Sequence, residues 1–118
     1  MKERFLPIGT IVILKDDSEK IMITSYCIFP KGKTVIKGKE ETAKRMFEYG
    51  GCIYPEGVED TDVVLVFDHK DIEKVVHLGY RNEAQKKLSS LLNQHYDQVK
   101  ADYESGKLTA KQLQGIEE

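Results

Sequence analysis

Acidic and histidine side chains gather in residues 52–80, the stretch of the chain with the most groups able to do chemistry. Asp68 and His69 are adjacent, and His77 follows eight residues after His69. A carboxylate beside an imidazole could act as a general acid–base pair. Neighbouring residues of a strand point to opposite faces, so Asp68 and His69 would diverge. We therefore expect Asp68 to cap a short helical turn, both histidines to lie on the surface, and no residue to be catalytic.

Metal binding is the second chemistry that these residues could support. Four carboxylates between Glu56 and Asp62 could hold calcium, which takes six or more oxygen ligands. The order of the oxygens and the position of the glycine match no EF-hand loop. The two cysteines, Cys27 and Cys52, are too few for a structural zinc site unless histidines complete it. We expect both cysteines to be reduced and buried, and we expect no metal and no cofactor.

Nucleic-acid binding has one candidate segment, residues 31–45, which contain six Lys or Arg and two Glu. Stacking on single-stranded bases would need aromatic side chains nearby, and those present, Phe47 and Tyr49, are expected in the core. The alternative is that this segment is a solvated loop that offsets the acidic residues of 56–73. We favour the alternative and do not expect nucleic acid as a partner.

Composition describes an ordinary globular domain. The chain has 118 residues, of which 40% are hydrophobic and 32% charged, with a formal net charge of −2. This charge gives no general attraction to nucleic acid or membrane. The sequence contains no run of 18 apolar residues and no signal-peptide pattern at its start. We expect a cytoplasmic protein with no membrane insertion.

Strand patterns fill residues 1–80. Strands rich in β-branched or aromatic residues are expected at about 10–15, 20–29, 52–54, 63–68 and 75–78. A further short strand is expected at 34–36, a helical turn or two at 40–46, and a break at Gly50-Gly51. The predicted fold class is α+β. We expect a small curved antiparallel β-sheet, or an SH3-like barrel, of about five strands, followed by a long C-terminal helix.

A long amphipathic helix begins after Asn82-Glu-Ala-Gln85, which matches a capping box. We therefore divide the chain into a β-rich domain (1–80) and a C-terminal helix with a frayed tail (81–118). The helix either packs on the sheet, pairs with a second copy, or binds another protein. The apolar residues assigned to partner binding are Leu88, Leu91, Leu92, Tyr96, Val99 and Tyr103. Exposed apolar surface is expected mainly from His95 onward.

Two motifs carry a resemblance to a known family. They are Tyr54-Pro-Glu-Gly57 and His69-x-Asp-Ile-x-x-Val-x-x-x-Gly-Tyr80. Together with the strands before them, they resemble DUF4176, a domain-of-unknown-function family of Gram-positive bacteria, over about residues 5–80. Members are small proteins found beside type VII secretion components and LXG-type toxins. The resemblance implies a non-enzymatic chaperone or targeting adaptor for a secreted toxin.

Type VII substrates typically carry Trp-x-Gly and a Tyr-x-x-x-Asp/Glu tail. This chain has no Trp, and Lys100 and Lys107 stand four residues after Tyr96 and Tyr103. We therefore expect it to remain in the cytoplasm unless it leaves bound to its cargo. The alternatives are an immunity protein that binds a toxin's effector domain through the acidic 56–73 segment, and a nucleic-acid-binding regulator.

Overall fold

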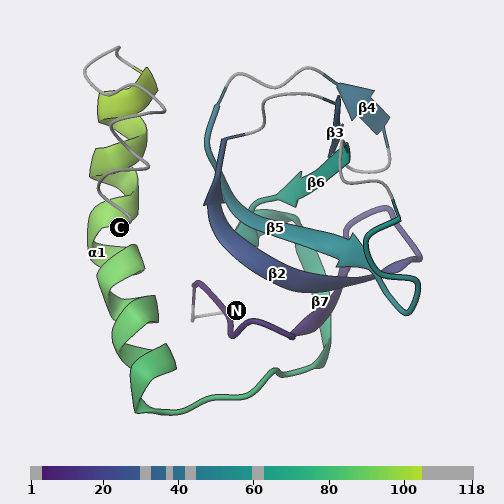
Figure 1. Cartoon of the computed structure of the whole chain (residues 1–118), viewed down its shortest axis with the longest axis horizontal. Helices are drawn as coiled ribbons and strands as arrows, with labels where there is room; N and C mark the ends of the chain where they lie inside the picture. Colours follow the sequence, from purple (N-terminus) through teal and green to yellow (C-terminus); the bar gives the residue numbers. More distant parts are fainter. Residues whose placement is uncertain (1–3, 30–32, 37–38, 42–44, 60–62, 105–118) are drawn as a thin grey trace.

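The computed structural model describes residues 4–29, 33–36, 39–41, 45–59 and 63–104. In these residues one curled sheet of seven strands lies beside a single long helix (Figure 1). The strands are β1 (Ile11–Leu14), β2 (Lys20–Ile28), β3 (Lys33–Ile36), β4 (Lys39–Glu41), β5 (Phe47–Ile53), β6 (Val63–Phe67) and β7 (Ile72–His77). A 3₁₀ turn η1 (His69–Asp71) precedes β7, and the helix is α1 (Glu83–Glu104). The α+β class is confirmed.

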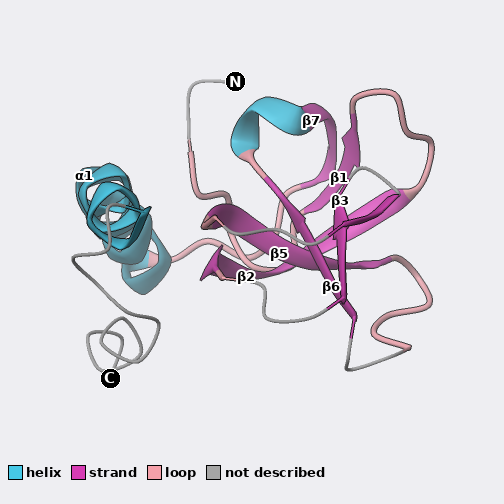
Figure 2. Ribbon diagram, turned by 90° about the horizontal axis from the view of Figure 1, so that it is seen from above, coloured by secondary structure: helices cyan, strands magenta, loops and turns pink. Residues whose placement is uncertain are grey.

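The sheet differs from the one expected in size and in strand direction. Its order is β4-β3-β6-β5-β2-β1-β7, and β3 runs parallel to β6 while the other neighbours are antiparallel. The expectation of about five strands, all antiparallel, was therefore wrong. Among the described residues β4 and β7 are the two edges and do not pair with each other, so the sheet is open and an SH3-like barrel is not shown (Figure 2).

Two segments expected to lie outside strands belong to the sheet. Residues 39–41 form β4, where Glu41 pairs with Thr34, although the composition of 40–46 favours a helix. The glycines at 50 and 51 lie inside β5 and do not break it. A Cβ added to Gly51 would lie 2.6 Å from the Met22 backbone oxygen, so β5 and β2 come too close for a side chain there. The glycine pair permits this approach.

The main core lies between the curled strands. Tyr49 is fully buried there and stacks on Phe67, with ring centroids 5.2 Å apart. Its hydroxyl oxygen accepts the backbone N–H of Leu6 at 3.0 Å, which ties the N-terminal segment to β5. The expectation that Phe47 and Tyr49 are core residues is confirmed.

A second apolar cluster joins α1 to the sheet. Tyr96 packs its ring 5.4 Å from that of Phe5, and its hydroxyl donates to the Met46 carbonyl at 3.2 Å. About two turns earlier, the Ser89 hydroxyl donates to the Arg4 carbonyl at 3.0 Å. The N-terminal segment therefore lies between the sheet and the helix (Figure 1). Of the three roles considered for α1, the structure shows packing on its own domain.

The buried phenols predict a loss of stability at alkaline pH. Burial raises the pKa of Tyr49 and Tyr96 above the usual value for tyrosine. The stabilisation is complete below the unfolded pKa of about 10 and is lost as the pH rises toward the folded pKa. Above pH 10 each buried tyrosine should lower the free energy of unfolding by about 1.4 kcal/mol per pH unit.

Urea unfolding between pH 9 and 12, followed together with phenolate absorbance, would measure this slope. Tyr49→Phe should reduce this slope by the contribution of one buried tyrosine, about 1.4 kcal/mol per pH unit. A free energy of unfolding that stays constant from pH 10 to 11.5 would contradict the burial of these two phenols.

Candidate functional site

Of the α1 residues that were assigned to partner binding, some are buried in the structure and others are exposed. Tyr96 is buried, and Leu92 and Val99 are partly buried against the Phe5–Met46 cluster. Leu88 and Leu91 are 45% and 54% exposed. The side chain of Tyr103 lies outside the described residues. The large apolar side chains that α1 leaves exposed, among those described, therefore lie before His95, and the expectation that they would follow it was wrong.

Exposed apolar side chains concentrate in one continuous stretch of chain. Of the eight large exposed apolar residues found among the described ones, five lie between residues 76 and 91. We call these five the 76–91 surface: Val76, Leu78, Tyr80, Leu88 and Leu91. Tyr80 is 80% exposed, the largest fraction of the eight. Large exposed apolar patches mark interaction sites more often than isolated exposed residues do, so this stretch is the candidate binding site.

Two hydrogen bonds hold the linker between β7 and α1 in place. In the middle of the linker, the Gly79 N–H donates to the Thr10 hydroxyl at 3.0 Å. A Cβ on Gly79 would lie 2.3 Å from the Ile8 carbonyl oxygen, so the linker packs closely against the segment that precedes β1. At the other end, the Asn82 side chain accepts the Gln85 N–H at 2.9 Å, which confirms the predicted cap. The linker from β7 to α1 is therefore anchored although its side chains are exposed.

Sequence reasoning missed the linker half of this surface. The motif that carries the family resemblance includes Val76, Leu78 and Tyr80, but it was interpreted as a strand end only. Val76 lies in β7, an edge strand that within the described residues pairs with β1 alone, and Leu78 and Tyr80 follow that strand in the linker. A short apolar strand followed by Leu-Gly-Tyr, with no partner strand after it, was the available indication.

Asp68 is the centre of a structural network of hydrogen bonds and an ion pair. Asp68 caps η1 as predicted, its backbone N–H donating to the Asp71 carboxylate at 3.0 Å. Asp68 is also buried, pairs with Arg45 at 2.9 Å, and accepts the Glu48 N–H at 3.1 Å. These bonds join β5 to η1.

Histidine placement differs from the expectation in one case. His69 was expected on the surface, but it is half-buried, with its Nδ1 2.8 Å from the Tyr49 hydroxyl. Its backbone N–H donates to Glu48 at 2.9 Å, and Glu48 is also paired with Arg4. His77 is exposed at the far end of β7, beside Ile11. Asp68, His69 and His77 therefore do not form one site.

In the part of the chain that the structure describes, no three His, Cys, Asp or Glu side chains are placed so that they could hold a metal ion. Glu56 and Glu59 are exposed, whereas Asp60 and Asp62 lie outside the described residues. Neither cysteine is in a disulfide within the described residues, and Cys52 is buried whereas Cys27 is half-buried, so the expectation of burial holds for Cys52 alone.

Most of the basic 31–45 segment lies outside the described residues or has no described side chain. Arg45 is described, and its guanidinium lies 3.8 Å from the centroid of the Phe47 ring. Within the described residues, no helix has the length and apolar character needed to cross a membrane.

Comparison with known proteins gives one result. The model of a family described as a domain of unknown function, DUF4176, matches residues 5–88. That span includes every strand that the structure describes and four of the five residues of the 76–91 surface. No curated protein and no solved structure matches the chain.

Proposed function

The chain belongs to the DUF4176 family, and from that membership and the 76–91 surface we propose that it is a non-enzymatic accessory protein that binds another protein. The resemblance described above gives the partner as an LXG-type toxin or a type VII secretion component. In this proposal the protein acts in the cytoplasm as a chaperone or targeting adaptor. It holds an apolar segment of the toxin until export.

The observation that carries the proposal is the concentration of exposed apolar side chains on an anchored stretch. Leu88 and Leu91 are three residues apart in α1, so they lie side by side on the helix surface. An amphipathic helix of the partner can pack its apolar face against such a pair. A specific interface buries roughly 1,000 Å² or more, and in this proposal it also includes the exposed linker residues Leu78 and Tyr80.

A pair of charge substitutions tests the proposal. Leu88→Glu/Leu91→Glu places two carboxylates where the partner's apolar face would lie, and should weaken binding at least ~100-fold, because central apolar contacts cost ~2 kcal/mol or more each when lost. The control is Ser90→Glu/Asn93→Glu, which adds the same charge with the same spacing to exposed positions on another side of the same helix. The toxin or secretion component is captured from the host with the wild-type protein, purified, and titrated against each variant.

The control variant should bind like the wild type, and both variants should keep the wild-type urea midpoint. Equal loss of binding in the two variants would reject the 76–91 surface as the site that binds the partner. If only a second copy of the chain is captured, and Leu88→Glu/Leu91→Glu dissociates that dimer, the surface is a homodimer interface and the adaptor proposal fails. Deletion of α1 is a poorer test, because it also removes Tyr96 from the second apolar cluster.

A further inference from the structure

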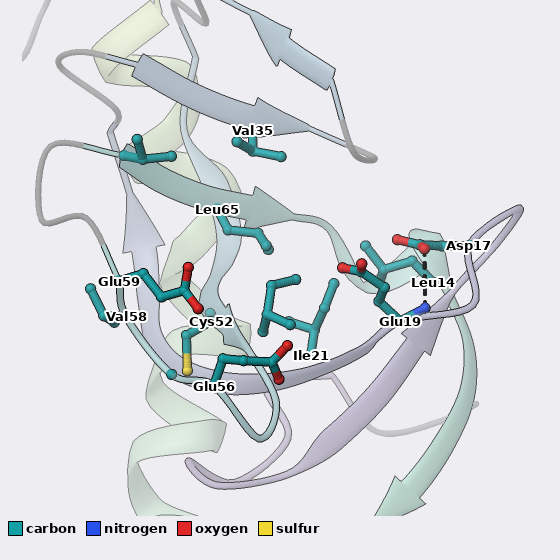
Figure 3. Close-up of a pocket in the computed structure, with 14 residues that line it drawn as sticks. Leu14, Asp17, Glu19, Ile21, Val35, Cys52, Glu56, Val58, Glu59 and Leu65 are labelled. Atoms are coloured by element: carbon teal, nitrogen blue, oxygen red, sulfur yellow. Dashed lines mark hydrogen bonds between the residues drawn. The ribbon is translucent and has the colours of Figure 1, made fainter.

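A cavity of about 580 Å³ opens at one end of the curled sheet (Figure 3). Its floor is the edge of the main core, where Leu14 and Ile21 are buried while Ile53 and Leu65 are partly exposed. Val35 of β3 also lines the cavity and lies beside Leu65, its register partner in β6. Ligand-binding cavities usually measure about 300–1,000 Å³, and the volume of this cavity lies in that range.

Four carboxylates surround the cavity. Asp17 and Glu19 come from the turn between β1 and β2, and Glu56 and Glu59 come from the segment after β5, on the opposite side (Figure 3). Asp17 is fixed in direction, because it accepts the N–H groups of Ser18 at 2.7 Å and Glu19 at 3.1 Å. The 14 lining residues that the structure describes include these four carboxylates and no Lys or Arg.

The arrangement of these charges selects the kind of ligand. In the described residues no three of the carboxylates come close enough together to hold a metal ion. Charges that face each other across an apolar floor instead complement an extended ligand with separate cationic groups and an apolar centre. We infer that the cavity binds a short segment of a partner protein in which apolar side chains are flanked by Lys or Arg. The apolar side chains enter the floor, and the cationic groups pair with the carboxylates on either side.

This site is independent of the proposed function. None of the residues that line the cavity belongs to the 76–91 surface. The two sites can therefore be tested separately, and the loss of one leaves the other intact.

The test uses a dye-labelled 12-residue peptide with a central Leu-Leu pair and two Lys on each side, titrated into the full chain by fluorescence anisotropy. Glu56→Gln/Glu59→Gln removes two rim charges and should weaken binding roughly 3- to 10-fold, as expected for partly exposed charge pairs. The control Glu73→Gln/Glu83→Gln removes two exposed charges outside the cavity and should leave the affinity unchanged. Peptides with Lys→Glu or Leu-Leu→Ser-Ser should bind at least ten times more weakly than the parent.

Methyl NMR locates the bound peptide. Signals of Val35, Ile53 and Leu65 should shift on titration, while those of Val76, Leu88 and Leu91 should not. Binding that is equal for the two glutamine variants, binding of the Lys→Glu peptide as tight as the parent's, or shifts confined to the 76–91 surface would each overturn the inference. So would the absence of any binding up to 1 mM peptide.

Discussion

Tyr96→Ala is expected to lower the free energy of unfolding by about 3–5 kcal/mol, the range for removal of a buried aromatic side chain. The ring fills the second apolar cluster against Phe5, 5.4 Å away, and the Arg4 guanidinium lies 4.8 Å from its centroid. The substitution also leaves the Met46 carbonyl without the phenol that donates to it. Domains of this size have about 5–15 kcal/mol in total, so a large share of the stability depends on this contact.

Urea unfolding followed by circular dichroism measures the effect, with two controls. Tyr96→Phe keeps the ring and loses one hydrogen bond, so it should cost about 1 kcal/mol. His95→Ala changes an exposed neighbour on the same helix and should stay within about 0.5 kcal/mol of wild type. If Tyr96→Ala costs no more than His95→Ala, α1 does not pack on the sheet in solution.

Gly51→Ala is expected to have the second large effect. The added methyl group would lie 2.6 Å from the Met22 carbonyl oxygen and 2.9 Å from Ile21 Cγ2. Because the first of these atoms is backbone, the pairing of β5 with β2 must open to admit the methyl group. We expect a cost of about 3 kcal/mol, at the upper end of the range for overpacking, or failure to fold.

Gly50→Ala is the matched comparison, because it lies in the same strand one residue earlier. Its added methyl group would lie 2.4 Å from Ser25 Oγ and 3.0 Å from Ile28 Cγ1, which are both side-chain atoms. Those atoms can move by rotation about their side-chain bonds, so the cost should be clearly smaller than at Gly51. Urea midpoints of the two variants give the order directly. Equal midpoints would mean that the β5–β2 approach is looser than the structure shows.

Local sequence patterns predicted the elements that depend on neighbouring residues. Asn82 and Gln85 marked the start of α1, and Asp68 with Asp71 marked η1, because each cap is made by side chains within three residues of its partner. The β-branched runs located β1, β2 and β6. These elements needed no knowledge of distant contacts.

Elements that depend on distant pairing were not predictable. The helix-favouring composition of 40–46 was overridden where Glu41 pairs with Thr34, and the parallel β3–β6 pairing joins strands separated by the whole of β4 and β5. The glycines at 50 and 51 are turn-like in local sequence, and only their contact with β2 shows why they lie in a strand.

The sequence predicted which residues form the apolar face of α1. It did not predict which of them pack on the sheet and which stay exposed. One apolar stripe supplied both the residues that pack on the domain and those that remain exposed. Tyr96 could be distinguished from Leu88 only by the position of Phe5 and Met46, which come from distant parts of the chain. The same limit applies to the cavity, whose carboxylates come from two separate connections of the sheet.

Hydrogen–deuterium exchange of the protein, alone and in complex with its purified partner, tests the central claim most directly. We expect the partner to slow amide exchange in residues 76–91, because a bound segment opens to solvent less often. Slower exchange confined to other segments, with 76–91 unchanged in a saturated complex, would contradict the proposal that this surface binds the partner.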